Sequence, residues 1–144
     1  MNKTDENNHA LRNAQAHIAM YVDACAKYQT LIDGRVDEEV EIDGDTFKDA
    51  TELTDWLQEG ALSVEIRDGW YTSGDKSGGP EEFKILVSTG GPAFRIIGEL
   101  DQYNQPSNVR AEHQDWGTPW IEVELSNEEQ EAVDWFAGLF YYGE

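Results

Sequence analysis

The stretch Phe83–Leu100 reads FKILVSTGGPAFRIIGEL and determines the predicted fold class. Two runs rich in β-branched and aromatic residues flank a Gly-Gly-Pro turn, which predicts an antiparallel hairpin. Alternating apolar residues in 61–72, with Leu62, Val64 and Ile66 on one side, predict a strand before it. Two shorter strands are expected after it, at about 107–114 and 120–125.

Helical patterns surround this meander on both sides. Residues 8–33 carry apolar residues at helical spacing and predict a long amphipathic helix, with Cys25 on its apolar face. Asp49 followed by Glu52, and Ser126 followed by Glu129, are capping-box patterns that predict a short helix over 49–59 and a C-terminal helix. The fold class predicted is α+β, with these three helices packed on an antiparallel sheet of four to five strands.

Length and composition indicate one domain over 1–144, with residues 1–7 frayed, although the 144 residues include 30 acids and only 10 bases. No run of apolar residues is long enough for a membrane helix, and the polar N-terminus has no apolar signal region. One cysteine cannot form an internal disulfide. We therefore expect a cytoplasmic protein, and a net charge of −20 argues against direct binding to nucleic acid or membrane.

The acidic residues are concentrated in two segments. Residues 36–59 hold ten acids and one base, and residues 111–144 hold nine acids and no base, so these segments carry −18 of the −20. Residues 1–35 are neutral and 60–110 carry −2. Acidity acquired for solubility alone would be spread more evenly, and concentrated like charge costs stability. The distribution favours a purposeful acidic surface over generic acidity.

In the first acidic segment, carboxylates recur at regular spacing. On an extended chain alternate residues share a face about 6.6 Å apart. This predicts a row of Glu39, Glu41 and Asp43, which Asp37 and Asp45 extend over 37–45 if the chain stays extended. Acids three and four residues apart predict a second row along the next helix. The predicted partner-binding residues of this segment are Asp37, Glu39, Glu41, Asp43, Asp45, Asp49, Glu52, Asp55 and Glu59.

The second acidic segment adds Glu122, Glu124, Glu128, Glu131 and Asp134 to the predicted partner-binding residues. Acids in the first turn of a helix also favour the helix dipole, so a purely structural role for Glu128 remains an alternative. Trp135, Leu139 and Tyr142 fall opposite the expected core face of the last helix. They are a partner contact or homodimer seam, or they are covered by another part of the chain, or the end of the chain frays.

Residue patterns for catalysis and metal binding are missing. The three histidines have no metal-ligand partners at useful spacing, and no acidic stretch has the glycine and glutamate positions of a calcium loop. The glycine-rich run 88–92 lacks the lysine of a phosphate-binding loop. We therefore predict no enzyme activity, no metal and no cofactor.

Five short motifs stand out in the second half of the chain: Trp70-Tyr71, Glu82-Phe83, Ser88-Thr89-Gly90-Gly91-Pro92, Gly98-Glu99-Leu100-Asp101 and Asp115-Trp116-Gly117-Thr118-Pro119-Trp120. Through these motifs, the stretch from about 56 to 143 resembles small uncharacterised proteins encoded by phages, prophages and plasmids. The resemblance implies a counter-defence context and assigns no site residues. In composition alone the chain is also similar to DNA-mimicking antirestriction and anti-CRISPR proteins.

The sequence thus predicts an acidic DNA mimic that inhibits a bacterial defence complex, a CRISPR effector or restriction enzyme, by occupying its nucleic-acid site. Carboxylates in rows would compete with phosphates for the lysines and arginines of such a site. Two alternatives stay open. One is an immunity or antitoxin-like protein that neutralises a basic toxin. The other is an acidic interaction module of a mobile element, without mimicry.

Overall fold

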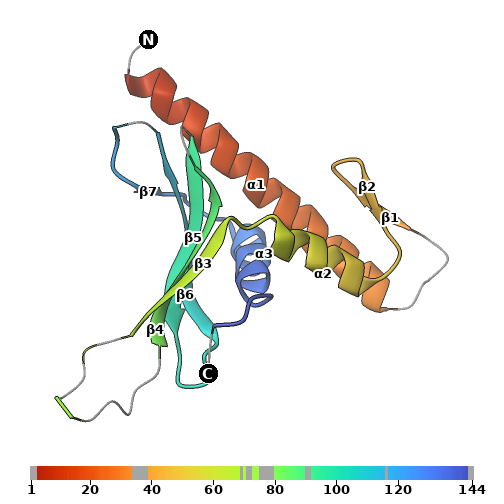
Figure 1. Cartoon of the computed structure of the whole chain (residues 1–144). Helices are drawn as coiled ribbons and strands as arrows, with labels where there is room; N and C mark the ends of the chain where they lie inside the picture. The colour runs from red at the N-terminus through yellow and green to blue at the C-terminus, as the bar shows by residue number, and fades with distance from the viewer. Residues whose placement is uncertain are drawn as a thin grey trace.

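The computed structural model describes residues 3–33, 39–68, 70, 73–74, 80–89, 92–115 and 117–142. Within these ranges the chain forms three helices, a two-stranded hairpin and a five-stranded antiparallel sheet (Figure 1). The elements in chain order are α1 (Lys3–Ile32), β1 (Val40–Ile42), β2 (Asp45–Phe47), α2 (Ala50–Glu59), β3 (Ser63–Asp68), β4 (Pro80–Ser88), β5 (Ala93–Leu100), β6 (Pro106–Gln114), β7 (Ile121–Glu122) and α3 (Asn127–Ala137).

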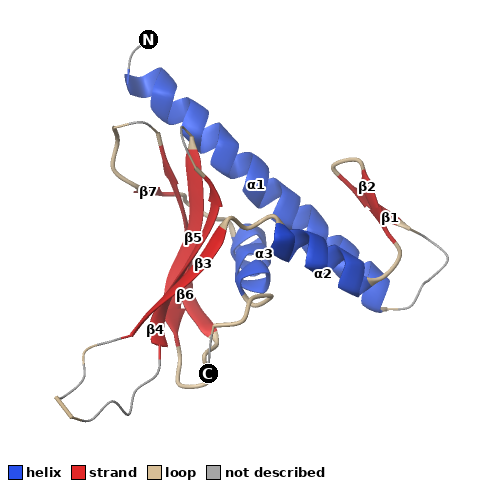
Figure 2. Ribbon diagram, in the orientation of Figure 1, coloured by secondary structure: helices blue, strands red, loops and turns tan. Residues whose placement is uncertain are grey.

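The large sheet is a simple meander in the order β3-β4-β5-β6-β7. The predicted central hairpin is confirmed, with Ile85 opposite Ile96 and Phe83 opposite Gly98, while residues 90–91 of its turn lie outside the described residues. Buried residues alternate with exposed or half-buried ones along β5 and β6, because one face of the sheet packs on helices and the other is open. Figure 2 shows the helices gathered on one side of the strands. The predicted α+β class is therefore correct.

α1 and α3 cover the inner face of the sheet and form the core with it. Tyr21 of α1 stacks on Phe136 of α3, with 4.1 Å between ring centroids, and lies against Phe94 of β5. Tyr21, Phe94 and Phe136 are nearly inaccessible to solvent. Burial of aromatic side chains of this size contributes about 1.5–3 kcal/mol each, so this cluster fixes how α1 crosses the sheet.

The capping box predicted for α3 is present, and of the pattern predicted for α2 the N-cap bond is present. The Ser126 hydroxyl accepts a hydrogen bond from the Glu129 backbone N–H, while the Glu129 carboxylate accepts from the Ser126 N–H, which together start α3. Asp49 caps α2 by accepting from the Glu52 N–H at 2.9 Å. Such caps satisfy backbone groups that the first helical turn leaves unpaired.

Some boundaries and faces differ from those predicted. α1 begins at Lys3, although residues 1–7 were expected to fray, and Ile32 is half exposed because the helix runs past the sheet. The strand expected over 61–72 spans Ser63–Asp68, and its apolar residues Leu62, Val64 and Ile66 are exposed. The strand expected at 120–125 comprises only Ile121–Glu122.

Candidate acidic interface

The first acidic segment folds into a tight hairpin at Asp43 and Gly44. Both residues have positive φ, +52° and +87°, as a two-residue hairpin turn requires. The predicted continuous row over 37–45 is therefore wrong, because the chain reverses at Asp43. Glu39 and Glu41 are exposed, but the pairing of Asp45 with Ile42 places Asp45 on the opposite face of the hairpin from Glu41. Asp37 lies outside the described residues.

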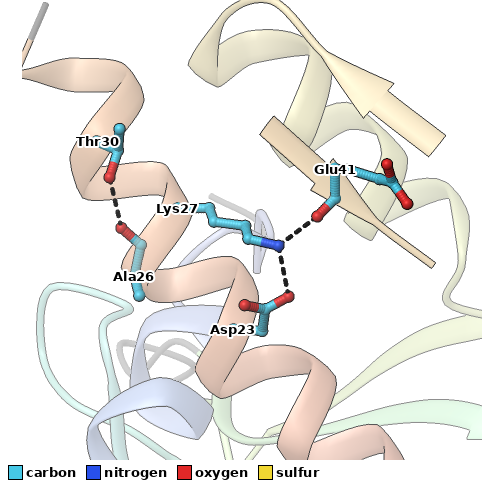
Figure 3. A network of polar contacts seen from close by, with 5 residues as sticks. All are labelled: Asp23, Ala26, Lys27, Thr30 and Glu41. Carbon is cyan, nitrogen blue, oxygen red and sulfur yellow. Dashed lines mark hydrogen bonds and ion pairs between the residues drawn. The ribbon is translucent and has the colours of Figure 1, made fainter. Parts of the chain in front are cut away.

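Packing of the hairpin against α1 and α2 leaves Glu39 and Glu41 on its outer face. Val40, Ile42 and Phe47 are buried, and the Phe47 ring lies 5.3 Å from the Trp56 ring of α2. Figure 3 shows that Lys27 of α1 reaches the hairpin through its backbone, donating a hydrogen bond to the Glu41 carbonyl oxygen. The Glu41 carboxylate points away from the ammonium group. Lys27 thus positions the hairpin without neutralising its carboxylate.

The predicted row along α2 is present, with two members also engaged in capping. Asp49 caps the helix, and the Glu52 carboxylate accepts a hydrogen bond from the Lys48 backbone N–H at 2.8 Å. Asp55 and Glu59 are exposed, whereas Leu53 and Leu57 form the buried face. We call the exposed carboxylates of these two elements the hairpin–α2 acids: Glu39, Glu41, Asp43, Asp45, Asp49, Glu52, Asp55 and Glu59.

The predicted acids of the second segment are exposed as well. We call them the C-terminal acids: Glu122, Glu124, Glu128, Glu131 and Asp134. Asp134 accepts a hydrogen bond from the Gln130 side chain at 2.9 Å. Within the described ranges, none of the hairpin–α2 acids or C-terminal acids forms an ion pair with a basic side chain.

The hairpin and Glu131 of α3 lie on different sides of α1. The hairpin is attached at Lys27, whereas Glu131 lies near Cys25, whose pKa is raised first by burial and further by this carboxylate. Residues two apart on a helix point about 200° away from each other. The hairpin and Glu131 therefore border opposite flanks of α1.

One described base of the sheet, Arg110, lines a surface hollow together with Glu122 and Asp134 of the C-terminal acids. Arg67, Lys84, Arg95 and Arg110 alternate with buried positions and so point to the open face of the sheet. Three of them pair with neighbouring acids, as Arg95 does with Glu112 at 2.7 Å, and Arg95 also lies 3.9 Å from the Trp120 ring centroid. Positive charge on the sheet is thus largely compensated locally, in contrast to the acids around α1.

The apolar residues expected as a partner seam contact their own chain. Tyr142 is buried, its ring centroid lies 4.8 Å from that of Phe83, and its hydroxyl donates to the Ala137 carbonyl oxygen at 2.6 Å. The half-buried Trp135 packs on Tyr28 of α1, and the half-buried Leu139 accepts a hydrogen bond from Gln58 of α2. The seam prediction is wrong for Tyr142, because α3 ends at Ala137 and its helical spacing does not continue to 142.

A groove that the sequence did not reveal lies between α1, α2 and the hairpin turn. Its volume is about 560 Å³, and His17, Met20, Asp43, Trp56 and Glu59 are among its lining residues. His17 stacks on Phe94 with 5.0 Å between ring centroids. Burial lowers the pKa of His17, and the nearby Asp43 carboxylate partly opposes that shift. His17 was expected to be a surface or packing residue, since no sequence signal relates it to Asp43.

The described residues limit the chemistry of this region. They include no cluster of three or more histidine, cysteine or acidic side chains placed to hold a metal ion. No helix among them is long and apolar enough to cross a membrane. Comparisons of the chain with protein-family models, curated proteins and solved structures gave no match.

Proposed function

We propose that this protein is a non-enzymatic inhibitor whose hairpin–α2 acids occupy the nucleic-acid-binding site of a bacterial defence complex, a CRISPR effector or a restriction enzyme. The observation that supports it most is the uncompensated state of these acids: all eight are exposed, and none pairs with a described lysine or arginine. A surface of this kind attracts a cationic groove over a long range.

The rigid attachment of the acids supports the same proposal. Asp43 occupies a hairpin turn with fixed backbone angles, Glu41 lies on a strand held by Lys27, and Asp49 and Glu52 cap α2. Carboxylates that are fixed before binding lose less conformational freedom when they meet lysines and arginines of a partner. The hairpin–α2 acids therefore fit the role of a preformed polyanion better than a mobile acidic tail would.

Two features argue for binding without catalysis. The groove beside the acids contains His17 and Asp43, but its lining includes no serine, cysteine or lysine that this pair would activate as a nucleophile. The phosphate-like role also needs no cofactor, since it uses charge alone. We place the protein in the bacterial cytoplasm, where such complexes act, in line with the resemblance to mobile-element proteins.

Displacement by DNA tests the proposal. The tagged protein, immobilised, captures its partner from a bacterial lysate in about 0.1 M salt, where exposed charges within about 10 Å of each other still interact. A short DNA duplex is then added, with a neutral polymer of equal mass as control. Release of the partner by the duplex supports occupation of a nucleic-acid site.

Other outcomes identify the alternatives. In one such outcome, salt releases the partner but the duplex does not. The partner is then a basic protein bound outside a DNA site, which is the result expected for an immunity or antitoxin-like protein. A partner that neither salt nor duplex releases is held by apolar contacts and indicates an interaction module without mimicry. Both results overturn the mimic proposal.

A further inference from the structure

β3 presents an exposed apolar edge to solvent. It is the terminal strand of the sheet, paired with β4 on one side. Leu62, just before the strand, is 57% exposed, and Val64 and Ile66 are 38% and 46% exposed. An edge strand with apolar side chains and free backbone groups is a template on which another strand can pair.

The exposed residues continue the inner, core-forming face of the sheet. Val64 pairs with Ile85 and Ile66 pairs with Phe83, and both of these partners are buried. Paired residues in an antiparallel sheet point to the same face. Val64 and Ile66 therefore belong to the face that α1 and α3 cover further along the sheet, but both side chains remain exposed at this end.

The alternate residues of β3 carry opposite charges on the open face. Glu65 lies 3.8 Å from Lys84, and Arg67 pairs with Glu82 on the neighbouring strand. Both side chains remain largely exposed in these pairs. Each can thus contact a second partner of opposite charge across the free edge.

We propose that two copies of this chain pair through β3, antiparallel, around a two-fold axis at Ile66. In this register Ile66 meets Ile66 of the second copy, and Glu65 faces Arg67 on each side of the axis. Val64 is paired with Asp68 and lies diagonal to Ile66. A two-fold interface must be self-complementary, and this one pairs the apolar Ile66 with itself and Glu65 with Arg67. A two-fold axis at Glu65 instead would place Glu65 against Glu65, which like-charge repulsion disfavours.

The dimer would join the two five-stranded sheets into one continuous sheet and bury the apolar edge of both. It uses none of the hairpin–α2 acids, so it stands independently of the proposed function. A second copy is favoured over an unrelated strand because the charges of Glu65 and Arg67 complement themselves only in the antiparallel self-pairing.

Sedimentation of two single charge variants, alone and mixed, tests the dimer. The full-length chain at about 0.15 M salt, where the Debye length is about 8 Å, should sediment as a dimer. Glu65→Arg places two arginines opposite each other in its own dimer, and Arg67→Glu places two glutamates opposite each other. Each variant alone should dissociate at least tenfold more readily than the native chain.

Mixing the two variants should restore the dimer. In the mixed pair, the arginine introduced at position 65 of one copy faces the glutamate introduced at position 67 of the other. On the far side of the axis the native Arg67 of the first copy faces the native Glu65 of the second. Circular dichroism of each variant checks that it is folded. Ile66→Lys, which puts two ammonium groups on the axis, should be monomeric. A monomeric native chain, or a mixture that stays as dissociated as its components, overturns the proposal.

Discussion

Lys27 holds the Glu41 backbone and leaves the Glu41 carboxylate exposed (Figure 3). The ammonium group spans from α1 to the carbonyl oxygen of β1 and also contacts Asp23 one helical turn away, at 3.0 Å. An ammonium group this close to the acidic hairpin would ordinarily pair with one of the hairpin carboxylates. Here it pairs with an acid of its own helix, so the hairpin acids keep their charge.

Replacing Lys27 by Met should loosen the hairpin without unfolding the domain, because the aliphatic part of the side chain is kept and the hydrogen bond is lost. A net hydrogen bond contributes about 0.5–1.5 kcal/mol. Amide hydrogen exchange of Val40 and Ile42 should become faster by about tenfold, while that of β5 stays unchanged. Equal protection of the hairpin in both proteins would contradict the anchoring role of Lys27.

Two substitutions of Asp49 distinguish the role of its carboxylate as a helix cap from its contribution to the surface charge. Asp49→Ala removes the cap of α2 and should lower the free energy of unfolding by about 1 kcal/mol. Asp49→Ser removes the same charge but keeps an oxygen that accepts from the Glu52 N–H, so its stability should match that of the native protein. The measurement is guanidinium denaturation. Equal loss in both variants would show that the charge and not the cap matters to stability.

Close packing of β4 on β5 depends on Gly98. A Cβ atom at this position would come within 2.7 Å of the Phe83 ring and 2.9 Å of the Ser107 carbonyl oxygen. Gly98→Ala should therefore destabilise the fold by about 1–3 kcal/mol, the usual cost of overpacking. Gly60→Ala is the matched control, since its nearest contact would be 3.5 Å. A thermal melting temperature equally insensitive to both changes would contradict this packing.

Stability should fall as the pH drops below about 6.5, the ordinary histidine pKa. Burial lowers the pKa of His17, against a smaller opposing effect of Asp43, and burial also lowers the pKa of His113. The unfolded chain therefore takes up protons at a higher pH than the folded one, so the folded state loses stability as pH falls through about 6.5.

Guanidinium denaturation at pH 7.5 and 5.5 measures this loss. The double variant His17→Leu and His113→Leu should show a smaller decrease between the two pH values than the native protein. The same decrease in both proteins would mean that other groups titrate in this range.

Local sequence patterns predicted much of the fold. The β4–β5 hairpin, the N-cap of α2 and the capping box of α3 follow from alternation and from side chains a few residues apart. The predicted acidic row over 37–45 requires an extended chain. The turn angles place Asp45 on the opposite hairpin face from Glu41, which alternation along a single strand cannot indicate.

Features that depend on contacts between distant elements could not be predicted in the same way. The proximity of His17 and Asp43 needs the hairpin to fold back on α1. Tyr142 is buried because the chain leaves the helical path after Ala137 and turns toward Phe83. The exposure of Val64 and Ile66 depends on where the helices end above the sheet, and alternation shows only that they share a face.

Reversing three charges in the hairpin, with three equal reversals among the C-terminal acids as a control, tests whether the hairpin–α2 acids bind the partner. Glu39→Lys, Glu41→Lys and Asp45→Lys together raise the net charge from −20 to −14, and so do Glu122→Lys, Glu124→Lys and Glu128→Lys. Asp43 is left in place because its positive φ suits aspartate better than lysine.

The quantity measured is affinity for the partner that DNA displaces. The hairpin variant should bind at least about 30-fold more weakly, the smallest loss expected when close interfacial charge pairs are broken, while the C-terminal variant changes affinity by less than a third of that factor. Equal weakening by both variants would mean that total charge alone governs binding. Unchanged binding by the hairpin variant would mean that the hairpin–α2 acids do not contact the partner.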